Sequence, residues 1–230
     1  MQPRSATIPT YVVIPVKNQL ALTRSLVEQL HEQGGHQAIF VFDNGSTDET
    51  GEWLAERARE GVLEAIDAAD RALYEMWNAG VRRARGRDAV CNIAILNNDL
   101  VIGDAFCERL ASTLRGDPRL WAVSPRYDDR RFGGVQYVSS TFKNGGLAGF
   151  AFMARGEAFD HVGFDEALRW WYGDDDFVAQ IEALGHRVGL TDATCVVHIN
   201  NGGQTMTYDN PMLWQIEHDT VLMYKKWGHT

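Results

Sequence analysis

Short apolar runs alternate with amphipathic segments over the first hundred residues, and this alternation constrains the fold more than any other feature. The runs are typical of buried strands and cover residues 11–16, 38–42, 62–66 and 89–96. Apolar residues at helical spacing predict helices over residues 18–32, from a capping pattern at 46–49 to about residue 59, and over 71–85. Such alternation predicts an α/β fold with a mostly parallel sheet and helices on both faces. Ligands of such sheets bind beyond the carboxyl ends of the strands.

The second half of the chain has a less regular pattern. We expect an apolar strand that runs through Met153 and a helix that starts near Asp174 and ends at Gly185. Two short strands are predicted over residues 187–190 and 195–197. A C-terminal helix is predicted from the spacing of Leu213, Ile216, Thr220, Met223 and Trp227.

Composition and charge exclude several classes of protein. Apolar residues make up 45 % of the 230 residues, which is enough for a sizeable core. The formal net charge of −9 argues against general nucleic-acid binding, since phosphates need a basic face. No apolar run approaches the ~18 residues that span a bilayer, and the N-terminus lacks a signal-peptide core. Three cysteines without zinc spacing favour a reducing compartment, so we expect a cytoplasmic protein.

Polar residues follow two of the predicted strands where the fold would place a ligand. Asp43 and Asn44 follow the second strand, and their carboxylate and amide suit a nucleobase or ribose as well as a turn. Asn97, Asn98 and Asp99 follow the fourth strand and suit a hard cation such as Mg²⁺ or Mn²⁺. An Asx turn before the next helix is the alternative for this second group.

A third acidic group, residues 174–176, stands at a predicted helix start. Three adjacent carboxylates repel one another, although the helix dipole partly offsets the repulsion. One of them has the chemistry of a general base, and an N-cap is the structural alternative. His198 follows an apolar run and suits either a structural hydrogen bond or a borderline metal such as Mn²⁺.

Together these segments form an ordered set. They are VVIPVKN, VFDNGSTDET, WNAGVRRARG, ILNNDLVIG, GFAFMARGEAFDHVGFDE and YGDDDFVAQIEALGHRVGL, followed by His198. In this order they resemble the GT-A fold, family 2-type inverting glycosyltransferases, over roughly residues 10 to 200. The resemblance implies a single domain over residues 1–230. About 8–103 would form its nucleotide-sugar-binding half, and about 104–230 its acceptor-binding and catalytic half.

The resemblance also implies roles for individual residues. A divalent metal, Mn²⁺ or Mg²⁺, would be held by Asp99 and His198. Residues 97–99 match the family's DXD motif, with Asn97 in place of the first Asp. The base would be Asp174, because Asp176-Phe177 aligns with the conserved helix start of the family. The family's Glu-Asp pair reads Gly173-Asp174 here, so the Glu is missing and Asp175 is the second candidate. The donor nucleotide would be contacted by Pro15, Val16, Asn18, Asp43, Asn44, Asn78, Asn97 and Asn98. Trp170, Trp171 and Tyr172 would stack on an acceptor sugar, with core packing as the alternative.

The reaction implied is inverting sugar transfer from a nucleotide-diphosphate sugar, with UDP first and dTDP second, to an acceptor hydroxyl. A glycan, a lipid-linked saccharide, a protein or a modified nucleobase would fit as acceptor, and a homodimer is left open. A nucleotidyltransferase is disfavoured because residues 12–18 lack a glycine-rich basic loop. The remaining alternative is a non-catalytic module that binds a nucleotide sugar or a glycan.

Overall fold

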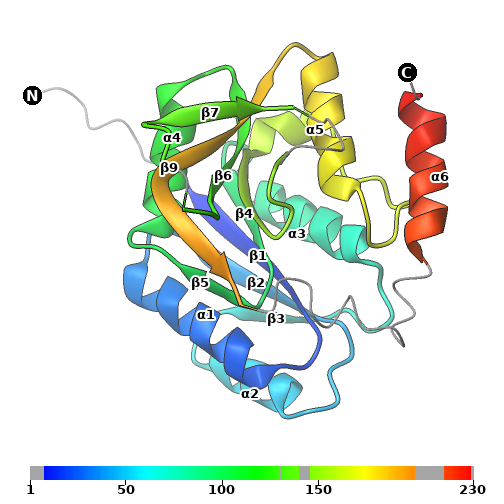
Figure 1. Ribbon diagram of the computed structural model, residues 1–230. Coiled ribbons are helices and arrows are strands. Elements are labelled where there is room, and N and C mark those ends of the chain that lie inside the picture. Colours follow the sequence, from blue (N-terminus) through cyan, green and yellow to red (C-terminus); the bar gives the residue numbers. More distant parts are fainter. Residues whose placement is uncertain (1–7, 130, 140–145, 200–214, 229–230) are drawn as a thin grey trace, which may run out of the picture.

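The computed structural model describes residues 8–129, 131–139, 146–199 and 215–228, and its strands join in one sheet (Figure 1). The strand order is β3-β2-β1-β4-β8-β6-β9-β5, and β7 pairs with β9. The strands are β1 (Thr10–Val16), β2 (Ala38–Asp43), β3 (Glu64–Asp67), β4 (Asn92–Leu96), β5 (Leu100–Ile102), β6 (Leu120–Arg126), β7 (Val135–Val138), β8 (Ala151–Arg155) and β9 (Arg187–His198). The helices are α1 (Leu20–Gln33), α2 (Thr50–Arg59), α3 (Leu73–Arg87), α4 (Phe106–Gly116), α5 (Gly173–Ala183), α6 (Gln215–Trp227) and the 3₁₀ helix η1 (Gly156–Asp160).

Helices cover both faces of the sheet, as the alternation predicted, and they create two cores. Helices α1, α2 and α4 pack on one face, where Leu26 and Phe106 are fully buried. On the other face, α3, α5 and α6 pack with buried residues such as Trp77, Phe177 and Met223. Strands β1 and β4 contribute to both cores because their side chains alternate between the faces. None of the described helices is long and apolar enough to cross a membrane.

The parallel pairing predicted from the first hundred residues is confirmed for β1 to β4, but it does not extend to the second half of the chain. Strands β3, β2, β1 and β4 are parallel, but β8 is antiparallel to both β4 and β6. Strands β5 and β7 are antiparallel to β9 as well. The sequence pattern did not reveal β5, β6 and β7. The two short strands predicted after residue 186 are one strand, β9, whose register against β6 shifts between Pro125 and Arg126.

The start of α2 also differs from the predicted capping pattern. The helix begins at Thr50 rather than after Ser46, whose hydroxyl accepts a hydrogen bond from the backbone N–H of Asn18 at 2.7 Å. The carboxylate of Asp48 accepts the N–H of Thr50 at 3.0 Å instead. Ser46 is therefore used to join the loops after β1 and β2. Leu213, assigned above to the C-terminal helix, lies outside the described residues.

Helix α3 approaches the sheet closely at Gly80. A Cβ atom there would lie 2.5 Å and 2.6 Å from the two methyl carbons of Val13 in β1. Only glycine lets the helix pack at this distance, and the packing sets the position of the α3 N-terminus near the strand ends.

We predict that Gly80→Ala destabilises the fold by about 1–3 kcal/mol, because the added methyl overpacks the contact with Val13. Urea unfolding measures the change. Gly86→Ala in the same helix is the matched control, since nothing lies within 4 Å of a Cβ at that position. The control is expected to be neutral or stabilising by up to ~1 kcal/mol. Equal effects of the two substitutions would contradict the packing argument.

Candidate active site

A cavity of about 510 Å³ opens beyond the carboxyl ends of β1, β2 and β4. It is closed on its other sides by the N-terminal parts of α3 and α5, the segment before β8 and the end of β9. The lining residues are Pro15, Val16, Lys17, Asn44, Leu73, Tyr74, Met76, Trp77, Asn97, Asn98, Gly149, Phe150, Trp170, Trp171, Tyr172, Asp174 and His198. Its position is the one expected for a ligand site of an α/β sheet.

The ends of β1 and β2 supply one wall of this cavity. Pro15, Val16 and Asn44 line it, as does Lys17, which the sequence analysis did not single out. The buried Asn44 side chain donates to the carbonyl oxygens of Ala68 and Arg71, at 3.2 Å and 2.6 Å. Asn44 therefore both borders the cavity and fixes the chain after β3.

Three residues predicted to contact the nucleotide are not among the cavity-lining residues. Oδ1 of Asp43 accepts the N–H of Ser46 at 2.9 Å, and Oδ1 of Asn18 accepts the N–H of Thr47 at 2.7 Å. Both side chains hold the loop after β2.

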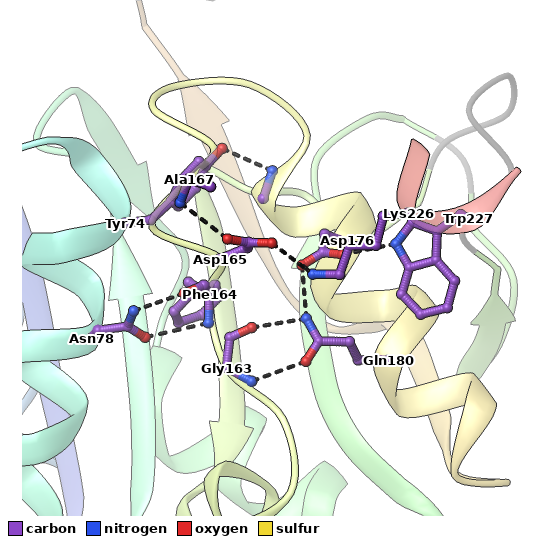
Figure 2. A network of polar contacts seen from close by, with 11 residues as sticks. Tyr74, Asn78, Gly163, Phe164, Asp165, Ala167, Asp176, Gln180, Lys226 and Trp227 are labelled. Carbon is purple, nitrogen blue, oxygen red and sulfur yellow. Dashed lines mark hydrogen bonds and ion pairs between the residues drawn. The ribbon is translucent and has the colours of Figure 1, made fainter. Parts of the chain in front are cut away.

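Asn78 joins α3 to the segment before α5 (Figure 2). Its amide nitrogen donates to the carbonyl oxygen of Phe164 at 2.8 Å and to Glu166 at 2.9 Å, and its amide oxygen accepts the N–H of Phe164. The contacts of Asn78 are thus with protein groups on the neighbouring segment.

Asp99 and His198 are brought together by strand pairing. Leu100 of β5 lies opposite His198 in the antiparallel β5–β9 ladder. Oδ1 of Asp99 lies 3.0 Å from Nε2 of His198, and the Phe150 ring stacks on the imidazole with the centroids 4.5 Å apart. The Asp99 side chain is only 11 % exposed, and its Oδ1 accepts no hydrogen bond from any residue that the structure describes.

This pair has the chemistry of two metal ligands. A buried carboxylate oxygen without a hydrogen bond is costly unless a cation or another donor satisfies it. Asn97 and Asn98 lie beside the pair, and the Asn98 amide donates to the Thr23 hydroxyl at 3.0 Å. Within the described residues there is no cluster of three or more His, Cys, Asp or Glu side chains that would hold a metal. Other oxygens would therefore have to complete a coordination shell.

The three aspartates at the start of α5 have different surroundings. Asp174 lines the cavity, and its carboxylate accepts backbone N–H groups of Gly149, Asp175 and its own residue. Asp175 is not among the cavity-lining residues. Asp176 is fully buried and bonded to Gln180, Lys226 and Trp227 (Figure 2).

Gly149 makes room for the Asp174 carboxylate. A Cβ on residue 149 would lie 2.4 Å from the carboxylate oxygen and 2.7 Å from its carbon. Tyr74 plays a similar part on the other side, where its hydroxyl accepts the N–H of Gly173 at 2.8 Å. Gly149 therefore holds the Asp174 carboxylate through its N–H, and Tyr74 holds the backbone of the residue before Asp174.

Burial changes the titration of this acidic group. Desolvation raises the pKa of Asp174, although backbone N–H groups oppose the change. Desolvation, and then repulsion from Asp174, raises the pKa of Asp175 to about 7. Burial thus favours the protonated form of both neighbouring carboxyls.

Aromatic rings form much of the remaining wall. Trp170, Trp171 and Tyr172 line the cavity and are half-buried, so they face it as well as packing on the protein. Tyr74 and Trp77 from α3 add two more rings, which pack edge to face at 5.2 Å. Local sequence patterns did not point to these two rings, because apolar residues in an amphipathic helix ordinarily belong to the core.

We predict that Asp175→Asn stabilises the protein at pH 8 more than at pH 4. The native pKa of about 7 lies above the ordinary value of 3.8, so the native state holds the extra proton between these values and loses stability as the pH rises through 7. Asparagine does not titrate, and the gap between variant and wild type should open over this range. Melting temperatures at the two pH values test this. Asp104→Asn, at an exposed position, is the control, and a gap independent of pH would contradict the prediction.

Comparison with known proteins agrees with the fold. GalNAc-T7 with UDP, GalNAc and Mn²⁺ superposes with a TM-score of 0.67 and 15 % identity, over 84 % of this chain and 44 % of that one. The Pyrobaculum calidifontis mannosyltransferase PcManGT with GDP-Man and Mn²⁺ has a TM-score of 0.65 and 18 % identity, over 94 % of this chain and 63 % of that one. S. aureus TarS 1–349 with UDP-GlcNAc has a TM-score of 0.66 and 14 % identity, over 94 % of this chain and 67 % of that one.

The chain thus spans about half to two thirds of the length of these structures. Because the sequence identities are low, the similarity shows a shared fold and no more. A search among curated proteins finds no match. The sequence profile of glycosyl transferase family 2 matches residues 11–187, most of the chain. The chain therefore belongs to glycosyl transferase family 2 and is a glycosyltransferase with the GT-A fold.

Proposed function

We propose that the protein is a metal-dependent inverting glycosyltransferase that moves a sugar from a nucleoside-diphosphate donor to an acceptor hydroxyl. One observation carries the proposal: a single cavity is lined by the half-buried carboxylate of Asp174 and by His198, whose Nε2 lies 3.0 Å from Oδ1 of Asp99. A group that removes a proton and a group that holds a cation thus face the same space. These are the two functions that displacement of a diphosphate requires.

The donor would enter from the ends of β1 and β2. Pro15, Val16 and Asn44 would contact the nucleoside there, with Lys17 near the phosphates. UDP is the first candidate because UDP or UDP-GlcNAc is bound in two of the similar structures, while the similar mannosyltransferase holds GDP-Man. Asp43 and Asn18 would support this wall through the loop that they hold.

Asp99 and His198 fit a divalent metal. The buried Oδ1 of Asp99 is without a hydrogen bond in the described part of the chain, and Nε2 of His198 lies 3.0 Å from it. Mn²⁺ accepts this oxygen and nitrogen pair, and phosphate oxygens and water would complete its shell. When bound, the ion would neutralise charge on the leaving diphosphate.

Asp174 would act as the general base. Its ionised carboxylate takes the proton of the acceptor hydroxyl while that oxygen bonds to the anomeric carbon of the donor sugar. The bond from that carbon to the diphosphate oxygen breaks on the opposite face, so the configuration inverts. A carboxylate with a raised pKa is a better proton acceptor, provided that the pH is high enough to ionise it. Trp170, Trp171 and Tyr172 would hold the acceptor sugar beside it.

We predict that Asp174→Asn lowers turnover by about 10²–10⁴-fold and leaves the affinity for UDP within about twofold. Release of UDP from labelled UDP-sugars with Mn²⁺ measures turnover, and calorimetry measures binding. Asp175→Asn is the matched control and should keep most of the activity, with a pH profile shifted to lower pH because it removes a repulsive charge. Full activity of Asp174→Asn would refute the base assignment. A wild-type chain that binds UDP but never cleaves a donor would favour a non-catalytic binding module.

We also predict that Asp99→Ala and His198→Ala each weaken UDP binding at least about tenfold in Mn²⁺, since each removes a ligand of the same ion. In EDTA the variants and the wild type should bind UDP equally. The double variant should be little worse than either single one, because the two side chains act together. Calorimetry in both buffers gives these values. Binding that is insensitive to Mn²⁺ in the wild type would exclude the proposed metal site.

A further inference from the structure

Helix α6 lies beyond the residues matched by the family profile, which ends at residue 187, yet it contacts the chain on both sides of Asp174. It stands beside α5 at the edge of the molecule (Figure 1). We propose that Asp219 and Thr220 of α6 are positioning residues that set how the acceptor is held. The proposal rests on the proposed function and adds residues that act through the aromatic wall.

The first contact is a buried carboxylate that holds the aromatic segment by its backbone. Asp219 is fully buried. Its carboxylate accepts the N–H of Arg169 at 3.1 Å, and those of Trp170 and Trp171 at 3.0 Å each. Nδ1 of His218 lies 2.9 Å from the same carboxylate. Three successive N–H groups directed at one carboxylate fix the backbone path of the two tryptophans.

The second contact reaches the third ring of the wall. The hydroxyl groups of Thr220 and Tyr172 are hydrogen-bonded at 3.0 Å. Tyr172 has a left-handed backbone with φ 64°, which a residue with a side chain rarely adopts unless its surroundings enforce it. This hydrogen bond therefore supports an unusual conformation at the residue that comes two positions before Asp174.

The third contact fixes the other side of Asp174. Asp176 accepts hydrogen bonds from Nζ of Lys226 at 3.0 Å and Nε1 of Trp227 at 2.8 Å (Figure 2). Lys226 also pairs with Asp165 at 2.8 Å. Helix α6 thus ties the start of α5 to the segment that carries the aromatic rings.

These contacts hold the acceptor side of the cavity. The walls from β1 and β2 carry the proposed nucleoside contacts, and Asn44 in those walls is held by the carbonyl oxygens of Ala68 and Arg71. Loosening α6 should therefore leave the binding of the nucleotide intact. It should misplace the rings against which the acceptor sugar rests relative to Asp174. Water would still reach the base, so hydrolysis of the donor should outlast transfer to a sugar.

The test compares Thr220→Val with Thr220→Ser. Valine has the shape of threonine but lacks the hydroxyl, whereas serine keeps it. With a UDP-sugar, Mn²⁺ and a panel of p-nitrophenyl glycosides as acceptors, Thr220→Val should lower the ratio of transfer to hydrolysis about fivefold. It should raise the acceptor KM more than it lowers kcat. Thr220→Ser should keep the wild-type ratio, and the affinity for UDP should stay within about twofold in both variants.

Asp219→Asn is the stronger substitution, because an amide loses at least one of the N–H acceptor contacts. Hydrogen exchange of peptides that cover residues 168–173 should speed up at least tenfold in Asp219→Asn, with exchange in β1 and β4 unchanged. Unchanged exchange there, or an unchanged transfer ratio in Thr220→Val, would overturn the proposal. A wild-type chain that neither transfers nor hydrolyses refutes the proposed function instead, and the exchange result still decides whether α6 holds the segment.

Discussion

The change of strand direction at β4 is the constraint on which the rest of this structure depends. On one side β4 is parallel to β1, and on the other it is antiparallel to β8. The parallel strands bring their carboxyl ends to one edge, where Val16, Asn44 and Asn97 meet. Because β8 runs the other way, the segment that leads into it crosses this edge and brings Gly149 and Phe150 over the strand ends. The cavity therefore lies where the two pairing modes adjoin.

The site is assembled from groups that folding alone would not favour. Asp174 and Asp175 are adjacent acids removed from water, and Asp99 has a buried oxygen without a hydrogen bond in the described ranges. The N-terminus of α5 and the backbone N–H groups around Asp174 offset part of the cost. Two large apolar cores on the faces of the sheet stabilise the fold enough to offset the rest of this cost in free energy. Such local costs are common where function conflicts with stability.

Local patterns predicted the parts of this structure that depend on neighbours in sequence. The period of apolar residues located β1, β2, β4 and their helices. The polar strand ends pointed to Asn44 and Asp99, and the acidic start of a predicted helix pointed to Asp174. The roles of Ser46, Asn78 and Asp219 could not be found in this way. Their partners lie 28, 86 and about 50 positions away, and no short pattern encodes such contacts. The same limit applies to β8, whose direction is decided by its neighbours in the sheet rather than by its composition.

The pairing of Leu100 with His198 has a consequence for the nascent chain. A protein emerges from the ribosome with its N-terminus first, and the parallel strands β1, β2, β3 and β4 are all made from the first hundred residues. Asp99 can contact His198 only after β9 has been synthesised. The backbone of Trp170 can be bonded by Asp219 only after α6 has been synthesised, which is later still. A half-synthesised chain can thus form the sheet edge that carries Asn44 and Asn97 well before Asp99 meets His198 and before Asp219 fixes the backbone of Trp170 and Trp171.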